Sequence, residues 1–118
     1  MNIIINENIS LISVQQEFHL VYPYLKIDFF LISKGVNPNR LLENSSKIFK
    51  EFQTKESSNS IVITPKMSVN ELEKLFFTEY GLKILIYRNS GRIWLATSAT
   101  ESWTLEEQNK QGKALNLD

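Results

Sequence analysis

Residues 68–81 constrain the fold most, because they carry both a start signal and a stop signal for one short helix. Ser68 and Glu71 form a capping box, in which each side chain binds a backbone N–H that the first helical turn leaves free. Gly81 supplies the left-handed residue that ends such a helix. The apolar residues between these signals recur on one helical face, namely Val69, Leu72, Leu75 and Phe76. The rest of the chain must therefore offer an apolar surface to this helix.

A β-hairpin is predicted directly after this helix. Residues 82–88 and 92–98 have the composition of strands, and they flank residues 89–91, whose glycine suits a left-handed turn position. A two-residue turn at Ser90-Gly91 would pair Tyr87 with Trp94 and place both on one face of the sheet. A three-residue turn would send Trp94 to the other face. Both registers remain open.

The N-terminal part predicts a strand, a helix and a second strand. Residues 2–6 are a short β-branched run. Apolar residues then recur at helical spacing until Pro23 ends the pattern: Leu11, Val14, Phe18 and Val21. Residues 24–32 alternate as a strand, with one row expected to face the helices: Leu25, Ile27, Phe29 and Leu31.

Three further elements are predicted from shorter signals. The spacing of Leu41, Ser45, Ile48 and Phe52 after Asn37-Pro38 predicts a helix within residues 38–53. Residues 54–60 resemble a linker, and residues 60–64 are a β-branched strand. A second capping box, Thr104-Leu105-Glu106-Glu107, opens a short C-terminal helix that Gly112 ends.

The resulting order of elements favours an α+β fold. Six of the predicted strands and helices match the ferredoxin-like βαββαβ unit, in which two helices cover one face of an antiparallel sheet. An extra C-terminal strand and a short helix would follow that unit. We expect one domain over residues 1–118, and a differently connected α+β roll is the alternative. No internal repeat is evident.

The composition excludes several classes of site. The chain has 118 residues, no cysteine and one histidine, which rules out disulfides, thiolate zinc sites, iron–sulfur clusters and multi-histidine metal cages. Its 13 basic and 13 acidic residues balance, so it lacks the positive charge of a protein that coats DNA. No apolar run has the length of a signal peptide or membrane span. We expect a cytoplasmic protein that binds no cofactor, metal or membrane.

The second half of the chain carries a resemblance to known sequences. It rests on Val69-Asn70-Glu71-Leu72-Glu73, Tyr80-Gly81-Leu82, Arg88-Asn89-Ser90-Gly91, Trp94-Leu95 and residues 103–109, with a weaker match at Glu17-Phe18 and residues 22–26. These segments resemble a group of short uncharacterised proteins from Bacteroidetes-type bacteria. That group has no assigned activity, so the resemblance implies a bacterial housekeeping or accessory domain and no site residues.

His19 is the first residue to consider for catalysis, because its side chain titrates near neutral pH. A small hydrolase or isomerase with His19 as the base is one hypothesis. The residues around it in the sequence supply no catalytic partner, and an ordinary histidine on a helix surface is the favoured interpretation. Whether the chain is an enzyme is left uncertain, with a non-catalytic role favoured.

The sheet face opposite the helices is the feature that calls for a function. We add Trp103 from the C-terminal segment as an interaction residue to the apolar residues expected on this face, which are Tyr24, Phe30, Ile32, Leu85, Tyr87 and Trp94. Aromatic side chains bury about 150 to 250 Å² each, so four half-exposed ones approach the patch of about 300 to 600 Å² that monomers tolerate. Something is expected to cover this face.

Three covers are compatible with the sequence. The first is internal: the segment from Thr100, with Trp103, Leu105, Leu115 and Leu117, or the insert at 38–53. The second is a protein partner, most simply a second copy in a homodimer. The third is single-stranded RNA stacked on the aromatics, which the neutral charge does not favour. The leading hypothesis is a non-catalytic interaction module. Its expected partner is a second copy of the chain or another protein.

Overall fold

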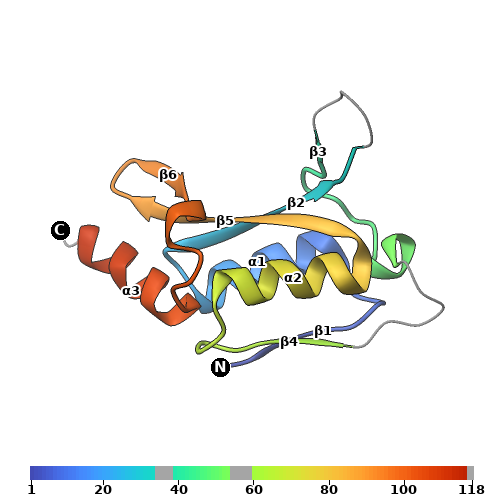
Figure 1. Ribbon diagram of the computed structural model, residues 1–118, viewed down its shortest axis with the longest axis horizontal. Coiled ribbons are helices and arrows are strands. Elements are labelled where there is room, and N and C mark those ends of the chain that lie inside the picture. The colour runs from blue at the N-terminus through green and yellow to red at the C-terminus, as the bar shows by residue number, and fades with distance from the viewer. Residues whose placement is uncertain (34–38, 54–59, 117–118) are drawn as a thin grey trace.

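The computed structural model describes residues 1–33, 39–53 and 60–116, and their fold is α+β (Figure 1). The elements follow the order β1 (Ile3–Ile5), α1 (Leu11–Val21), β2 (Leu25–Leu31), β3 (Arg40–Leu41), a 3₁₀ turn (Phe49–Phe52), β4 (Ile61–Ile63), α2 (Val69–Tyr80), β5 (Leu82–Ser90), β6 (Ile93–Ala96), a second 3₁₀ turn (Ser98–Thr100) and α3 (Leu105–Leu115). The predicted helices after Ser10, Ser68 and Thr104 are thus confirmed, but the end predicted at Gly112 is wrong because α3 continues to Leu115.

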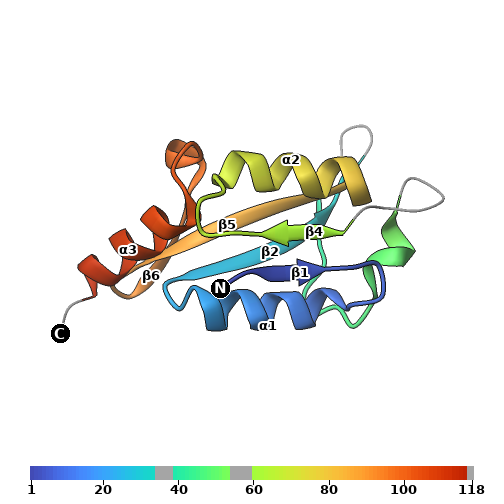
Figure 2. The ribbon, with the colours of Figure 1, turned by 90° about the horizontal axis from the view of Figure 1, so that it is seen from below.

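The strands form two antiparallel sheets rather than one. β3, β2, β5 and β6 make a four-stranded sheet in that order, and β1 pairs with β4 in a separate two-stranded sheet. Seen from below, the β1–β4 pair runs between α1 and α2 and lies across the inner face of the larger sheet (Figure 2). Rings from three elements meet in the core between these layers, where Phe29 contacts Phe49 and Phe76.

The ferredoxin-like arrangement is not confirmed. That arrangement needs one sheet containing all four main strands, whereas β2 pairs with β5 and leaves β1 and β4 to pair with each other. The physical reason is that an alternating pattern decides which face of a strand is buried, but it does not choose the neighbouring strand. The extra strand β6 and the C-terminal helix α3 are both present.

The helix predicted within residues 38–53 is wrong for most of its length. Arg40–Leu41 is a strand against β2, and only Phe49–Phe52 turns, as a 3₁₀ helix. Leu42 and Phe49 are the buried residues of this segment. Leu42 N donates to Phe29 O at 2.9 Å, so the segment extends the sheet edge instead of closing helical bonds. Residues 54–59 of the expected linker lie outside the described residues.

The hairpin register differs from both predicted registers. Ser90 pairs with Ile93 across a turn at Gly91-Arg92, where Gly91 has a φ of 68°. Tyr87 therefore lies opposite Ala96, and Trp94 lies opposite Asn89. The shift relative to the expected two-residue turn is an even number of residues, so Trp94 still shares the face of Tyr87.

The chain consists of two halves that repeat the same structure, contrary to the expectation from sequence. Residues at a constant separation take the same place in each half, as Ser10 and Ser68 do in capping α1 and α2. Their buried counterparts are Ile3 with Ile61, Ile5 with Ile63, Val14 with Leu72, Phe18 with Phe76, and Tyr22 with Tyr80. The antiparallel registers are symmetric about the Ile4–Val62 and Asp28–Leu85 pairs, which places a pseudo-twofold axis through both sheets.

The repeat extends to the segments that follow β3 and β6. Leu11 N donates to Lys47 O at 3.0 Å, and Val69 N donates to Trp103 O at 3.2 Å. The reciprocal bonds are repeated as well: Phe49 N to Ile9 O, and Leu105 N to Met67 O. Each helix start is thereby joined to the start of the next helical segment in its own half.

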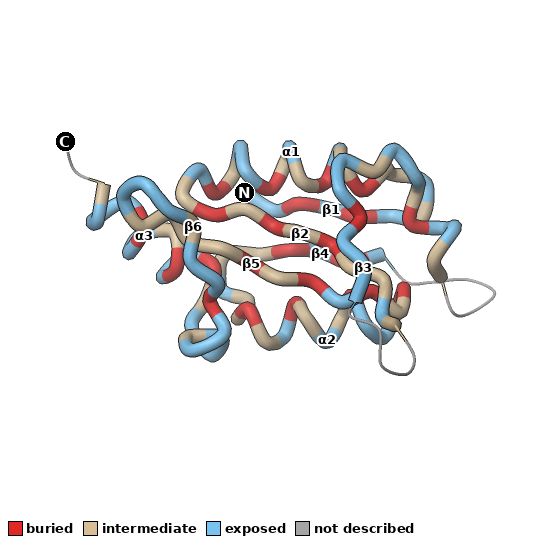
Figure 3. Tube along the Cα trace, turned by 90° about the horizontal axis from the view of Figure 1, so that it is seen from above, coloured by how far each residue is buried: buried red, intermediate tan, exposed pale blue. Residues whose placement is uncertain are grey.

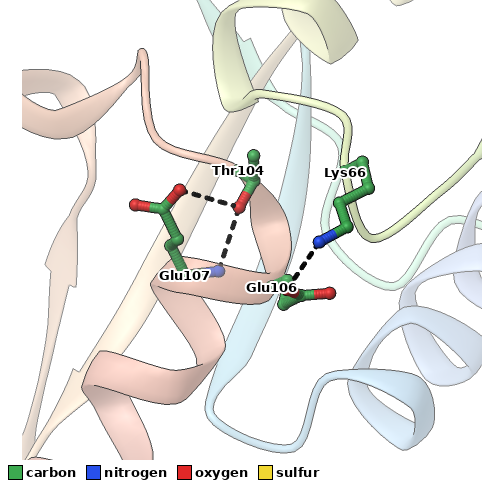
Figure 4. Close-up of polar contacts among 4 residues, drawn as sticks. All are labelled: Lys66, Thr104, Glu106 and Glu107. Atoms are coloured by element: carbon green, nitrogen blue, oxygen red, sulfur yellow. Dashed lines mark hydrogen bonds and ion pairs between the residues drawn. The ribbon is translucent and has the colours of Figure 1, made fainter.

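The first turn of α3 is held by its own cap and by the loop between β4 and α2 (Figure 4). Glu107 N donates to Thr104 Oγ1 at 3.1 Å, which confirms the predicted cap, and the Thr104 hydroxyl lies 3.4 Å from Glu107 Oε1. Lys66 Nζ forms an ion pair with Glu106 Oε1 at 3.1 Å. Further along α3, Gly112 meets the sheet so closely that a Cβ there would lie 2.7 Å from Tyr24 Cβ.

Candidate functional site

The face of the four-stranded sheet that points away from α1 and α2 is here called the outer face, and its residues are half-buried or exposed (Figure 3). Its residues follow from the strand alternation and the pairing registers: Lys26, Asp28, Phe30, Leu41, Lys83, Leu85, Tyr87, Trp94 and Ala96. In Figure 3, α3 lies beyond the β6 end of this face, and the tube around β3 passes over its opposite end. Leu117, expected as part of an internal cover, lies outside the described residues.

One end of the outer face is partly covered by the tip of the β5–β6 hairpin. The Lys26 ammonium lies 5.2 Å from the ring centres of both Tyr87 and Trp94. Trp94 also reaches the imidazole of His19 on α1, with ring centres 6.1 Å apart in an edge contact. The two rings attract the Lys26 charge through their electron-rich faces, so this end is a structured cation–π cluster.

The other end of the outer face is apolar and exposed. Phe30 lies opposite Leu41 of β3, and Leu85 lies opposite Asp28 at the pseudo-twofold axis. Phe30 and Leu85 are half-buried, whereas Leu41 is 42% exposed and the neighbouring Ile32 is 43% exposed. A group of large apolar side chains exposed to water on one face of a sheet marks a binding surface.

Trp103 does not join the outer face. It precedes α3, where its ring lies 5.6 Å from the guanidinium carbon of Arg88, a residue of the inner row of β5. The structure therefore brings together four of the five predicted interaction residues, Phe30, Leu85, Tyr87 and Trp94, and separates the fifth. Trp103 instead packs beside the helix starts, because its carbonyl accepts the Val69 N–H.

His19 lies on the exposed side of α1 beside the edge of β2. Its Nδ1 is 2.9 Å from Leu25 O. A carbonyl only accepts, so the neutral ring holds its proton on Nδ1 and leaves Nε2 as a free acceptor. A cavity of about 580 Å³ adjoins the ring and also touches Lys26 and Asp28. Within the described ranges, His19 has a backbone partner and an adjoining cavity, and no carboxylate partner.

Burial changes the titration of two outer-face groups. Burial raises the pKa of Asp28, with Glu43 adding to the rise and Lys26 opposing it. Burial also raises the pKa of Tyr87, and the Asp28 charge adds to the effect. Asp28 is further contacted by Gln15, whose Nε2 lies 3.4 Å from Asp28 Oδ1. The polar centre of this face is thus coupled to α1.

The described residues contain no group of three or more His, Asp or Glu side chains that could hold a metal ion. None of the helices in the described ranges is long and apolar enough to cross a membrane. No family model, curated protein or solved structure matches the chain. The interpretation of this surface therefore rests on its own geometry.

Strand alternation alone places Lys26 and Asp28 on the outer face and Lys26 near Tyr87 and Trp94. The sequence does not show that the Lys26 ammonium lies at the same distance, 5.2 Å, from the centres of both rings. A signal for the shared pairing was present: Leu-Lys-Ile occurs at residues 25–27 and again at 82–84, after the helix of each half. That repeated tripeptide marks equivalent strands that pair about the axis.

Proposed function

We propose that this protein is a non-catalytic interaction module that binds a protein partner, in the simplest case a second copy, through its outer face. The observation that carries the proposal is the exposed apolar end of that face, around Phe30, Leu41 and Leu85. At about 25 cal/mol per Å² of apolar area removed from water, covering such a patch is favourable. The hairpin covers the Tyr87–Trp94 end, so the partner would occupy the opposite end.

The layout of charge supports a protein as the partner. Lys83 lies opposite Phe30, and Asp28 lies opposite Leu85, so apolar side chains sit beside single charges of both signs. Protein interfaces commonly have an apolar centre and a polar rim. A sheet face of this kind suits a partner with mixed charge and exposed aliphatic side chains.

A paired substitution tests the proposal directly. Phe30→Ser with Leu41→Ser removes the apolar end without touching the inner core row. Gln16→Ser with Glu17→Ser on α1 serves as the matched surface control. We expect the first variant to lose binding to the partner recovered from native lysate, or to lose self-association by light scattering, while its far-UV circular dichroism is unchanged. Retention of all complexes by the folded variant would refute the proposal.

A small enzyme with His19 as base is the second candidate, favoured by the cavity that His19 shares with Lys26 and Asp28. The free Nε2 would take a proton from a substrate bound there. The test is a substrate-class activity screen with His19→Gln as the control, since glutamine retains a donor to Leu25 O. Activity that survives His19→Gln, or no activity in any class, rules this candidate out.

Single-stranded RNA binding remains a prediction with less support. The rings that would stack bases, Tyr87 and Trp94, already face the Lys26 ammonium. Fluorescence anisotropy with single-stranded RNA at low and high salt tests RNA binding. If no signal is seen at low salt, RNA binding is ruled out.

A further inference from the structure

A cavity lies where the end of α1 meets α3 and the loop before α2 (Figure 2). Its volume is about 540 Å³, which falls within the range of about 300 to 1,000 Å³ that is usual for small-ligand sites. None of the residues that line it belongs to the outer face. The cavity is therefore a second feature of the molecule, independent of the surface assigned to a protein partner.

Tyr22 brings to this cavity a buried hydroxyl that lacks a hydrogen-bond partner. The residue is 4% exposed, and its hydroxyl oxygen is buried with no partner among the described residues. Burial raises the pKa of Tyr22, and the charge of Glu106, which also lines the cavity, adds to the rise. The hydroxyl is thus protonated and lies near the α3 wall. Native structures rarely leave such a donor unpaired.

Asn109 supplies a second donor on the α3 wall. Its Oδ1 accepts from Tyr24 N at 3.0 Å, which fixes the orientation of the amide. The Nδ2 end then carries two N–H donors, and no hydrogen bond involves them in the part of the chain that the structure describes. Two neutral donors from different elements, Tyr22 and Asn109, therefore line one cavity, and both call for an acceptor.

The charged residues of the α3 wall favour an anion. Glu106, Asn109, Lys110 and Lys113 recur at helical spacing and share one face of the helix. Lys66 forms an ion pair with Glu106, so the acidic group of this wall is already balanced. Lys110 and Lys113 are exposed and form no ion pair within the described ranges. Their two ammonium groups leave an excess of positive charge beside the cavity.

The wall that α1 contributes is apolar. Leu20 is 79% exposed, which is unusual for so large an aliphatic side chain, and Val21 packs partly against the core. Pro65 adds a further apolar surface from the loop before α2. Donors and positive charge on one side and aliphatic groups on the other are complementary to an amphipathic anion.

We propose that this cavity binds a small organic acid, a monocarboxylate with an apolar body. The carboxylate accepts from Tyr22 Oη and Asn109 Nδ2, and Lys110 and Lys113 balance its charge. The two oxygens of a carboxylate accept about four hydrogen bonds, which matches this set of donors. The apolar body lies against the α1 wall. Glu106 beside the donors disfavours a group with two negative charges, such as a phosphate monoester.

The second half of the chain contains a matched position without the lysines. Tyr80 is the equivalent of Tyr22, it is 1% exposed, and its hydroxyl also has no partner among the described residues. Burial raises the pKa of Tyr80, and the charges of Glu7 and Glu79 add to the rise. These carboxylates would repel an organic acid. Tyr80 is therefore the natural control for the role assigned to Tyr22.

Titration of the isotope-labelled chain with octanoate, followed by NMR, tests the site. We expect saturable shifts of the Asn109 side-chain amide and of backbone amides in residues 20–22 and 106–113. Octanol, which keeps the apolar body but lacks the charge, is expected to bind about tenfold more weakly, because hydrogen bonds to a charged group are the stronger ones. Absence of saturable shifts with octanoate, equal binding of octanol, or tighter binding of octyl phosphate would overturn the proposal.

Single-atom changes in the two tyrosines locate the carboxylate. Tyr22→Phe removes only the donor and is expected to weaken octanoate about tenfold, whereas Tyr80→Phe leaves the affinity unchanged. Lys110→Gln with Lys113→Gln is expected to weaken it by about tenfold as well. The amide spectrum of each variant reports whether it is folded. If folded Tyr22→Phe binds as the wild type does, or Tyr80→Phe weakens binding equally, the assignment is wrong.

The outer-face variant separates this site from the proposed function. Phe30→Ser with Leu41→Ser removes the apolar end of the outer face and is expected to leave octanoate binding unchanged. Loss of octanoate binding in that folded variant would show that the acid adheres to the exposed outer face, and would overturn the cavity as its site. The protein-partner proposal is decided by its own binding assay, so either proposal can fail alone.

Discussion

Arg88 on β5 and Gln108 on α3 form a buried polar link between the sheet and the C-terminal helix. Arg88 Nη1 donates to Gln108 Oε1 at 2.8 Å, and the Gln108 side chain is fully buried. The Gln108 amide in turn donates to Thr100 O and to Thr100 Oγ1, both at 2.8 Å. Gln108 therefore joins β5, the second 3₁₀ turn and α3.

Gln108→Leu tests the strength of this link. The substitution leaves the Arg88 charge and the Thr100 carbonyl without their buried partner, which costs about 2 to 4 kcal/mol in the free energy of unfolding. Urea unfolding followed by circular dichroism measures the change. Gln111→Leu, at an exposed position of the same helix, is the control and is expected to stay within about 0.5 kcal/mol of wild type. Equal effects of the two substitutions would contradict the assigned role.

Gly112→Ala tests how closely α3 approaches the sheet. In a free helix this change is favourable by about 1 kcal/mol, because alanine is the better helix former. Here the new Cβ would lie 2.7 Å from Tyr24 Cβ and 3.2 Å from Arg88 Cγ. We expect a net destabilisation of about 1 to 3 kcal/mol, measured by thermal unfolding. A more stable variant would show that α3 is displaced from this position.

Lys26→Met tests the cation–π cluster. Methionine keeps most of the apolar stem but removes the charge between the Tyr87 and Trp94 rings, which costs about 0.5 to 1 kcal/mol. In a Trp103→Phe background the emission of Trp94 is seen alone, since the chain has two tryptophans. We expect its emission maximum to shift on removing Lys26, while Lys113→Met, on α3, leaves it unchanged. An unshifted spectrum would place Trp94 away from Lys26.

Asp28→Asn tests the pH dependence of folding. Burial raises the pKa of Asp28 above its ordinary value of 3.8, so the folded state holds the proton more tightly than the unfolded state. Stability from this group is therefore highest at low pH and declines as the pH rises from 3.8 through the raised pKa. We expect the variant to lose that part of the decline. Its free energy of unfolding, compared with wild type from pH 3 to 8, would show a difference that grows with pH. A constant difference would argue against a raised pKa.

Gln15→Glu with His19→Phe tests whether these side chains close the β2 edge. In the structure Gln15 Nε2 donates to Ile27 O at 3.0 Å and His19 Nδ1 lies 2.9 Å from Leu25 O, and the two changes remove both donors. We expect assemblies larger than those of the wild type, detected by light scattering and thioflavin binding. Gln16→Glu with Leu20→Phe, on the neighbouring positions of α1, is the control. No growth in size would mean that the edge is protected by other contacts.

Helices were predictable from the sequence because their signals are local. Ser68 and Thr104 each precede an apolar stripe and cap their helices as expected, and the helical spacing of residues 11–21 predicted α1, which Ser10 caps. The alternation along β2 and along β5 also placed Phe30 and Leu85 on one face of the sheet. These features depend on residues within a few positions of one another, where side-chain spacing decides the outcome.

Strand partners could not be predicted in the same way. Leu41 and Ile48 have helical spacing, yet Leu42 and Phe49 are the buried residues, because a backbone bond to Phe29 draws this segment to the sheet. The partner of β2 depends on which edges meet when the core closes. The candidate site could not be predicted for the same reason. The contact between His19 on α1 and Trp94 on β6 depends on the strand order, which brings these two elements together.

The internal repeat bears on how such a chain could arise. A half-length protein with this pattern would bury its helix only by associating with an identical molecule, and every edge would then occur twice. Joining both copies in one gene frees each to mutate separately. The two halves show this freedom at equivalent positions, where the first has Gln15 and His19 and the second has Glu73 and Phe77. Fusion turns a symmetric particle into one with a distinct front and back.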